Sequence, residues 1–345
     1  MTIGLNDKEL RNNIEKSEQI RSLYLLNKFQ SETKIPGDRY NQLLTSYLFD
    51  DLIEKSIKSS FCNKLPILVC VVKNELVRMK KFFEYYRKIG ITQFVIIDND
   101  STDGTLDLCI NQDNANVYSV KKIYSSARRV GWINQVLSRY GRNRWYIVAD
   151  ADELIDYVGS DSFSINNLIS SLTKKRIKRV LGLQVNFYSK ENSFEMSKDS
   201  INWDDCVYFD VDSYEKQNSK RCVWYVGGPR KRVFETYSLL TKYPLFYFDN
   251  NTLNISSHYL YPFEDNFKSP CLLCIKHYEF LNQSDYTKMI EIKKNGNYAN
   301  GSREYAEMLT VIQNKNILTF FDIKSSCKYA SSYDLLKIKY LTRLD

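Results

Sequence analysis

The stretch that decides the fold begins at residue 65 and reads Leu65-Pro-Ile-Leu-Val-Cys-Val-Val-Lys-Asn-Glu75. Its centre, residues 67–72, is a continuous apolar run rich in β-branched side chains, as in a strand that is buried on both faces. Residues 76–89 then follow the spacing of an amphipathic helix, and residues 94–97 form a second short apolar run. A strand, a helix and a second strand in this order predict a parallel βαβ unit.

The same alternation continues downstream. We expect a short helix at 105–112, a third strand at 116–120, a helix at 130–140 and a fourth strand at 144–149. Strands that alternate with helices predict an α/β fold with a mostly parallel, doubly wound sheet. In such sheets ligands bind beyond the carboxyl ends of the strands.

The flanking regions follow weaker patterns. Residues 7–60 have helical spacing interrupted at Pro36-Gly37, which predicts an N-terminal helical appendage. Beyond Gly159 we expect a loop-rich stretch at 190–222, strands at 180–188, 223–234, 243–248, 256–261 and 271–280, and helices at 285–295, 302–313 and 332–342.

Composition excludes several classes of protein. With 43 % hydrophobic residues the chain of 345 residues can bury a core, and its net charge of +8 suits an anionic ligand without choosing one. No apolar run approaches the roughly 20 residues of a membrane span, and no signal peptide is visible. The eight scattered cysteines are interpreted as reduced thiols of a cytoplasmic protein, and Cys271-Leu-Leu-Cys274 as core packing, because two further zinc ligands are not evident.

The sharpest motif is Asp150-Ala151-Asp152, which follows the fourth strand directly. Two carboxylates so placed can hold Mg²⁺ or Mn²⁺, because these cations prefer oxygen ligands and bind substrate phosphates at the same time. The metal would neutralise the charge that develops on a leaving diphosphate. The alternative is a polar loop that caps a helix at residues 153–158.

Two further polar clusters follow the first and second strands. The second strand leads into Asp98-Asn99-Asp100-Ser-Thr-Asp103-Gly104, and the first into Lys73-Asn74-Glu75. The functional interpretation places these side chains around a nucleoside. The alternative is turns and helix caps, which use the same residue types. The meeting of three polar strand ends at one edge of the sheet is the geometric basis of a binding site.

Together these residues resemble a known family. The run Val72-Lys-Asn-Glu75, the pair Gly90-Ile91, the cluster at 98–105, Trp145 and the segment 150–153 are similar to the family 2-like glycosyltransferases of GT-A fold, in the bacterial branch that also resembles family 92. Downstream matches are Gly227–Arg232, Lys242-x-Pro244-Leu245, Ser257-His258 and His277-Tyr278. The resemblance covers roughly residues 65–340.

The resemblance implies a Rossmann-like GT-A domain with a nucleotide-sugar-binding half at 61–160 and an acceptor-side half at 161–315, between an N-terminal segment (1–60) and a tail (316–345). It also implies a nucleotide-sugar donor, a divalent metal (Mn²⁺ or Mg²⁺) and inversion at the anomeric carbon. His277 is the candidate that completes the metal site of Asp150 and Asp152, with His258 as second choice. The donor-binding candidates are Lys73, Asn74, Glu75, Asp98, Asn99, Asp100, Asp103, Arg128, Asp150, Ala151 and Asp152.

The catalytic base and the phosphate contacts are less defined. Inverting relatives carry a Glu-Asp pair, which makes Asp265 a candidate base, with Asp205 as an alternative. Arg230 and Arg232 are candidates for contacts with phosphate or acceptor, because guanidinium groups bind phosphates bidentately. The alternative for these residues is a solvated charge run.

The sequence thus predicts a metal-dependent glycosyltransferase that uses a UDP-sugar and a hydroxyl of a surface polysaccharide or lipooligosaccharide. The tail at 328–343 suits peripheral contact with the inner face of the membrane. The alternative is a packed C-terminal helix. Two other functions stay open. A sugar-phosphate nucleotidyltransferase would need a glycine-rich loop where Lys73–Glu75 stands, and a basic module that binds glycan or nucleic acid would show a recognised motif.

Overall fold

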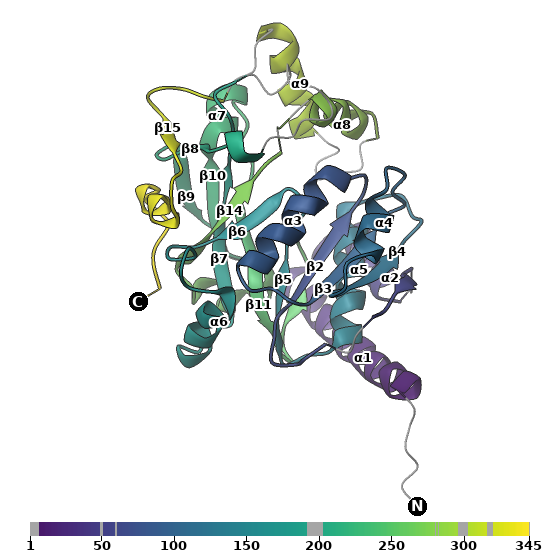
Figure 1. The fold of residues 1–345 in the computed structure, drawn as a ribbon. Coiled ribbons are helices and arrows are strands. Elements are labelled where there is room, and N and C mark those ends of the chain that lie inside the picture. Colours follow the sequence, from purple (N-terminus) through teal and green to yellow (C-terminus); the bar gives the residue numbers. More distant parts are fainter. Residues whose placement is uncertain are drawn as a thin grey trace, which may run out of the picture.

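The structure is a computed structural model that describes residues 7–48, 51–58, 61–191, 203–279, 281, 283–295, 303–315 and 320–344 (Figure 1). In these residues a large sheet of nine strands lies at the centre. From one edge to the other its strands are β1 (Ile53–Ser56), β4 (Ala115–Ser119), β3 (Phe94–Asp98), β2 (Ile67–Val72), β5 (Arg144–Val148), β11 (Thr241–Phe248), β7 (Arg179–Asn186), β14 (Cys271–His277) and β6 (Glu153–Asp156).

Six of these nine strands run in one direction, and β1, β11 and β6 run against them. The prediction of a mostly parallel α/β sheet is therefore confirmed. The central strands β2 and β3 are apolar along nearly their whole length and almost entirely buried, which fits strands covered by helices on both faces.

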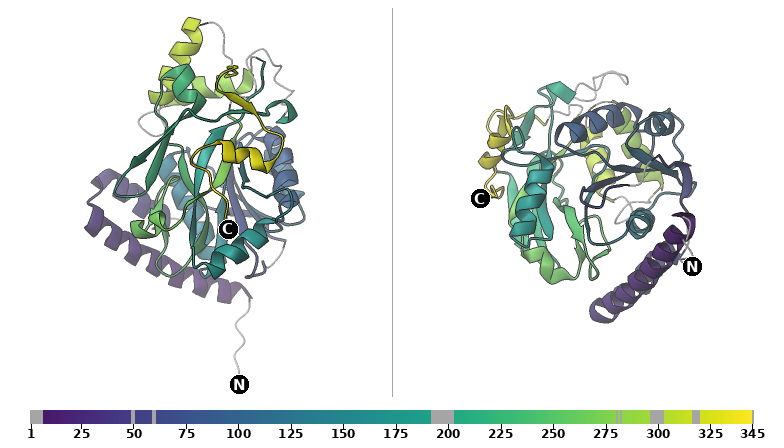
Figure 2. Two further views of the ribbon diagram at one scale, coloured as in Figure 1. Left: turned by 90° about the vertical axis from the view of Figure 1, so that its left-hand side faces the viewer. Right: turned by 60° about the horizontal axis from the view of Figure 1, so that its bottom comes forward.

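Helices flank the sheet on both faces (Figure 2). α3 (Leu76–Lys88) and α4 (Thr105–Ile110) lie on one side, and α5 (Ser126–Tyr140) on the other, where α1 (Asp7–Thr33) and α2 (Gly37–Leu48) pack against it. Ser125 caps α5 and Ser164 caps α6 (Ile165–Lys174), since each hydroxyl accepts a hydrogen bond from a backbone N–H of the first turn.

A smaller set of elements surrounds the second half of the sheet. It comprises β8 (Tyr208–Asp210), β9 (Tyr214–Asn218), β10 (Val223–Gly227), α7 (Gly228–Phe234), β12 (Leu253–Asn254), β13 (Leu260–Tyr261), α8 (Gln283–Asn295), α9 (Arg303–Lys315), β15 (Ser326–Lys328) and the 3₁₀ helices at Trp203–Asp205, Phe263–Phe267 and Ser332–Lys337. The pair α8 and α9 lies at the top of Figure 1, beyond the carboxyl ends of the parallel strands.

Several sequence predictions differ from the structure. Residues 53–56 are a strand and not part of a helix, because they pair antiparallel with β4 and extend the sheet by one edge strand. The strand expected over 223–234 ends at Gly227, where Gly228 and Pro229 begin α7, since proline suits the first turn of a helix. Residues 153–156 form strand β6 and not a helix, and the strand expected at 256–261 is limited to Leu260–Tyr261.

Candidate functional site

The carboxyl ends of β3 and β5 lie on either side of β2 at nearly the same height. Val72 of β2 pairs with Asp98, and Val69 pairs with Val148, so that Asp150, two residues further on, comes level with Val71. Because neighbouring strands are 4.7–4.9 Å apart, the two strand ends are separated by about 10 Å across the sheet. The structure therefore brings the Asp98 and Asp150 clusters to one edge, as the sequence predicts.

Asp150 is held by two cations. Arg129 of α5 donates from Nη2 to Oδ1 at 2.5 Å, and Lys242 of β11 donates from Nζ to Oδ2 at 3.0 Å. Burial raises the pKa of Asp150, but Arg129 and Lys242 outweigh it and lower the pKa to about 2. Lys242 also pairs with Glu153, which is buried and whose pKa is raised mainly by that burial. Asp150 is therefore ionised at neutral pH, with a cation on each oxygen.

Asp152 is paired with His277. The two atoms that face each other, Oδ2 and Nε2, are 3.3 Å apart, and the backbone N–H of Tyr278 donates to the carbonyl of Asp152. The other ring nitrogen of His277, Nδ1, lies 3.0 Å from Nη2 of Arg230 and 3.2 Å from Nδ2 of Asn186. Burial raises the pKa of Asp152, and the stronger effect of His277 and nearby cations lowers it.

These contacts decide how well the predicted metal ligands fit a divalent cation. Among the described residues no group of three His, Cys, Asp or Glu side chains is gathered closely enough to hold a metal ion. A cation on Asp150 would lie close to both Arg129 and Lys242, and two unit charges 4 Å apart repel by about 4 kcal/mol near a protein surface, or about twice that if one is divalent. The described residues as placed do not fit a divalent metal ion.

His277 fits the role of a metal ligand no better. Arg230 can only donate, so Nδ1 of His277 faces a hydrogen-bond donor there, and Nε2 faces Asp152. A histidine that binds a metal through Nε2 usually donates from Nδ1 instead. The sequence-based assignment of His277 as a ligand stays a prediction that this arrangement does not favour.

The loops after β2 and β3 are joined by reciprocal hydrogen bonds. Ser101 Oγ accepts from the backbone N–H of Asn74, whose Oδ1 accepts from the N–H of Thr102. Asn74 and Asp100 both have left-handed backbone conformations, with φ of 54° and 60°, which asparagine and aspartate tolerate better than most residues. These loops are thus held in one shape at the edge of the sheet.

Asp98 is fully buried at this edge. Its Oδ2 accepts from the backbone N–H of Ser101, whereas its Oδ1 has no hydrogen-bond partner. The neighbouring Asn99 donates to the carbonyls of Val120 and Lys122, and its own Oδ1 is also unpartnered. Buried polar atoms are normally hydrogen-bonded, so these two acceptors are left for a water molecule or for a ligand that reaches them.

Other predicted donor-binding residues have structural partners. Asp103 accepts from the N–H groups of Leu76 and Thr105 and so caps the starts of α3 and α4. Glu75 pairs with Arg78 at 3.0 Å and with Lys288 at 2.6 Å. Ala151 is buried, and Lys73 is exposed beside this cluster.

The arginines predicted to contact phosphate are placed elsewhere. Arg230 is buried and pairs with Glu279 and Glu304, and Arg232 forms two hydrogen bonds to the buried Asp210. Arg128 is exposed and donates to the carbonyl of Ile123. The guanidinium groups of Arg230 and Arg232 are thus paired with carboxylates inside the protein, and their contact with phosphate or acceptor stays a prediction.

The candidate base Asp265 lies at the wrong end of the sheet. It sits 3.8 Å from Arg179, the first residue of β7, whereas Asn186, the last residue of β7, contacts His277. Seven steps of about 3.3 Å along a strand separate these ends by about 23 Å. Asp265 is therefore excluded as the base. Asp205 belongs to a 3₁₀ helix whose Trp203 packs on Tyr278, with ring centroids 4.5 Å apart, so its role stays a prediction.

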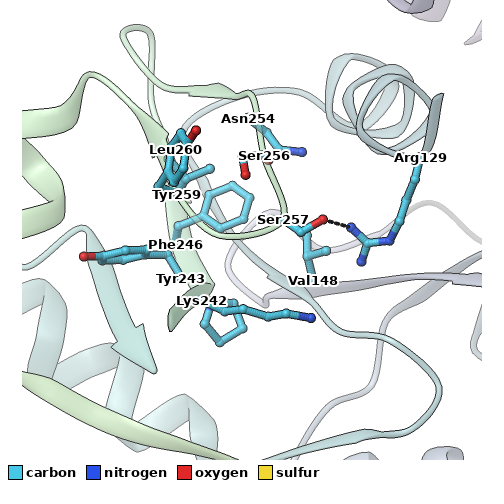
Figure 3. A pocket seen from close by; sticks show the side chains of 11 residues that line it. Arg129, Val148, Lys242, Tyr243, Phe246, Asn254, Ser256, Ser257, Tyr259 and Leu260 are labelled. Carbon is cyan, nitrogen blue, oxygen red and sulfur yellow. Dashed lines mark hydrogen bonds between the residues drawn. The ribbon is translucent and has the colours of Figure 1, made fainter. Parts of the chain in front are cut away.

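Two residues of the site, Arg129 and Lys242, were not among the sequence-based site candidates, although Arg128-Arg129 is a basic pair that suits phosphate and Lys242 stands in a motif of the family resemblance. Helical spacing could have indicated Arg129, because Trp132, Ile133 and Val136 follow it at three, four and seven residues and are all buried. Figure 3 shows Arg129 and Lys242 reaching one small cavity from different elements, with Arg129 donating to Ser257.

The cavity of Figure 3 is too small for a nucleotide. Its volume of about 20 Å³ holds a single water molecule. A second, open hollow of about 460 Å³ lies beside α3 and α4, between Lys80, Phe83, Arg87 and Gln112. Neither of these two is lined by Asp98 or Asp152.

His258, the second candidate for a metal ligand, donates from Nδ1 to the carbonyl of Thr241, which leaves Nε2 unprotonated in the neutral ring. Burial and the charge of Lys242 lower the pKa of His258 to about 4. The lowered pKa means that the native state prefers the neutral ring.

This preference makes stability depend on pH. The unfolded chain binds a proton at His258 below a pKa of about 6.5 and the native protein only below about 4, so stability is full above pH 6.5 and falls towards pH 4. At pH 5 we expect a loss of about 2 kcal/mol relative to pH 7.5 from this residue. Urea unfolding of the wild type and of His258→Asn at both pH values measures it. An equal loss in both proteins would contradict the expectation.

Comparisons with known proteins add little. No protein-family model and no curated protein matches the chain. Among solved structures, the mannosyltransferase PcManGT from Pyrobaculum calidifontis, in complex with GDP-Man and Mn²⁺, matches with a TM-score of 0.28 and 14 % identity. The match covers 48 % of this chain and 47 % of that one.

No helix in the described ranges is both long and apolar enough to cross a membrane.

Proposed function

We propose that the chain is a glycosyltransferase that takes a sugar from a nucleoside-diphosphate donor, with UDP-sugars as the first donors to test. The observation that carries the proposal is the placement of Asp98 and the Asp150–Asp152 pair on either side of β2, at the carboxyl edge of a parallel sheet. Ligands of such sheets bind at this edge. The family resemblance of the segments at 72–75, 98–105 and 150–153 supports the same activity.

The nucleoside end of the donor belongs beside Asp98 and Asn99. Their unpartnered oxygens can accept from the N–H of a base or the hydroxyl of a ribose, which relieves the cost of leaving buried acceptors unpaired. The diphosphate then extends towards Asp150 and Asp152. Both carboxylates are partly exposed, with 32 % and 26 % of the side-chain surface accessible, so this side of the edge is open to a ligand.

The reaction that follows is a displacement at the anomeric carbon. An acceptor hydroxyl attacks that carbon, the bond to the phosphate oxygen breaks with its electron pair, and the nucleoside diphosphate leaves. A carboxylate takes the proton of the acceptor, and attack from the opposite side inverts the configuration. A surface polysaccharide or lipooligosaccharide acceptor, and work at the cytoplasmic face of the inner membrane, belong to the proposal as inferences from the family resemblance.

Nucleotide binding tests the proposal. We expect UDP, GDP, CDP or dTDP at about 1 mM to raise the melting temperature, because a ligand that binds only the native state stabilises it. Transfer of a radiolabelled sugar should fall about 100-fold in Asp152→Asn, because the loss of this charge weakens the pair with His277 that orders this edge of the site.

Asp107→Asn is the matched control, because Asp107 is exposed on α4 and loses the same charge. Two results would sink the proposal: no melting shift with any of the four nucleotides, or transfer that survives intact in Asp152→Asn.

A further inference from the structure

We propose that the donor diphosphate is bound by Arg129 and Lys242, two side chains of the protein, and that the site works without a bound divalent cation. This inference rests on the proposed function and assigns a ligand to Arg129 and Lys242. It also departs from the metal requirement that the family resemblance implies.

A metal ion in this site would lie at the carboxylate of Asp150. Both oxygens of Asp150 already face a cation, Arg129 on Oδ1 at 2.5 Å and Lys242 on Oδ2 at 3.0 Å. The two cations come from separate elements, α5 and β11, so the arrangement does not depend on one loop. A divalent ion on this carboxylate would be repelled from two sides.

The other two predicted metal ligands are His277 and Asp152. Arg230, itself fixed by Glu279 and Glu304, donates towards Nδ1 of His277. Both ring nitrogens of His277 therefore already have partners within the chain, Nδ1 facing Arg230 and Nε2 facing Asp152 at 3.3 Å. Asp152 is left as a lone carboxylate, which is fewer protein ligands than the Asp150, Asp152 and His277 set that the sequence predicts.

Arg129 and Lys242 keep N–H groups that can still bind a ligand. The Lys242 ammonium has three N–H groups, of which Asp150 and Glu153 take two, and the Arg129 guanidinium has five, of which Ser257 and Asp150 take one each. Asp150 lies between the cations with a third of its side chain exposed. A diphosphate that approaches along this open side meets both cations, which are already oriented and largely desolvated.

The experiment measures nucleotide and metal binding separately on the full chain. Titration calorimetry with UDP and with GDP is run in EDTA and again in MnCl₂, and Mn²⁺ alone is titrated with detection by electron paramagnetic resonance. We expect Kd values that agree within about threefold in EDTA and in Mn²⁺. Mn²⁺ alone should give no site with a Kd below about 1 mM.

Two results would overturn the inference alone, and a third would also overturn the proposed function. Binding at least about tenfold tighter in Mn²⁺ than in EDTA would overturn the inference and leave the proposed function standing. One Mn²⁺ bound per chain in the wild type and lost in Asp152→Asn would do the same. Failure of UDP, GDP, CDP and dTDP to bind in either buffer would instead contradict the proposed function, and the inference with it.

Discussion

Replacing Arg78 with methionine is expected to lower the free energy of unfolding by about 4 kcal/mol, because it leaves a buried charge without its partner. Arg78 of α3 is 5 % exposed and its Nη2 lies 2.5 Å from Oδ1 of Asp285, which is 4 % exposed in α8. The same guanidinium pairs with Glu75 and donates to the carbonyl of Tyr278. This one side chain joins α8, α3 and the segment next to His277.

Urea unfolding measures the effect, and two variants make it specific. Arg303→Met removes an exposed arginine that pairs with Glu307 within α9, and it should cost less than about 0.5 kcal/mol. Adding Asp285→Asn to Arg78→Met removes the negative charge of Asp285 that Arg78 no longer balances, so the double variant should regain part of the lost stability. A single-variant loss below about 1 kcal/mol would show that the pair does not hold α8 in place.

Replacing Lys242 with methionine is expected to reduce glycosyl transfer at least about 100-fold, the effect of losing one preorganised charge from an active site. The ammonium of Lys242 contacts both Asp150 and Glu153. Burial lowers the pKa of Lys242, but the stronger effect of these two carboxylates raises it above its usual value, so the side chain is charged throughout the working pH range. Lys242 pairs with both Asp150 and Glu153, whereas Arg129 pairs with Asp150.

The controls separate charge from folding. Lys242→Arg keeps the charge and should retain more activity than Lys242→Met, although a planar guanidinium does not match the position of an ammonium. Lys231→Met removes a lysine of α7 that pairs with Glu215 at the surface, and its activity should equal that of the wild type. Equal activity of Lys242→Met and wild type, with both folded by circular dichroism, would exclude Lys242 from the site.

Much of the fold could be predicted because its signals are local. The apolar runs at Ile67–Val72 and Phe94–Asp98 are buried on both faces. An uninterrupted apolar run of this short length identifies such strands. β1 was missed for a complementary reason. Ile53–Ser56 is a largely exposed edge strand with two charged residues, and only its pairing with β4 makes it a strand.

The candidate site was predictable only in part. Asp98 and Asp152 were found because polar residues directly after buried strands lie at one edge of a parallel sheet. Asp265 was misplaced because a Glu-Asp dipeptide carries no information about which end of the sheet its loop occupies. The surroundings of Arg230 could not be predicted, because its partners, Glu279 and Glu304, come from 49 and 74 residues further along the chain.

The central claim is that a nucleoside diphosphate binds along the edge formed by β3, β2 and β5. A crystal structure of the chain with UDP tests it most directly. The account predicts the uridine beside Asp98 and Asn99 and diphosphate oxygens within hydrogen-bonding distance of Arg129 and Lys242. UDP bound in the hollow beside α3 and α4, or anywhere else away from this edge, would contradict it.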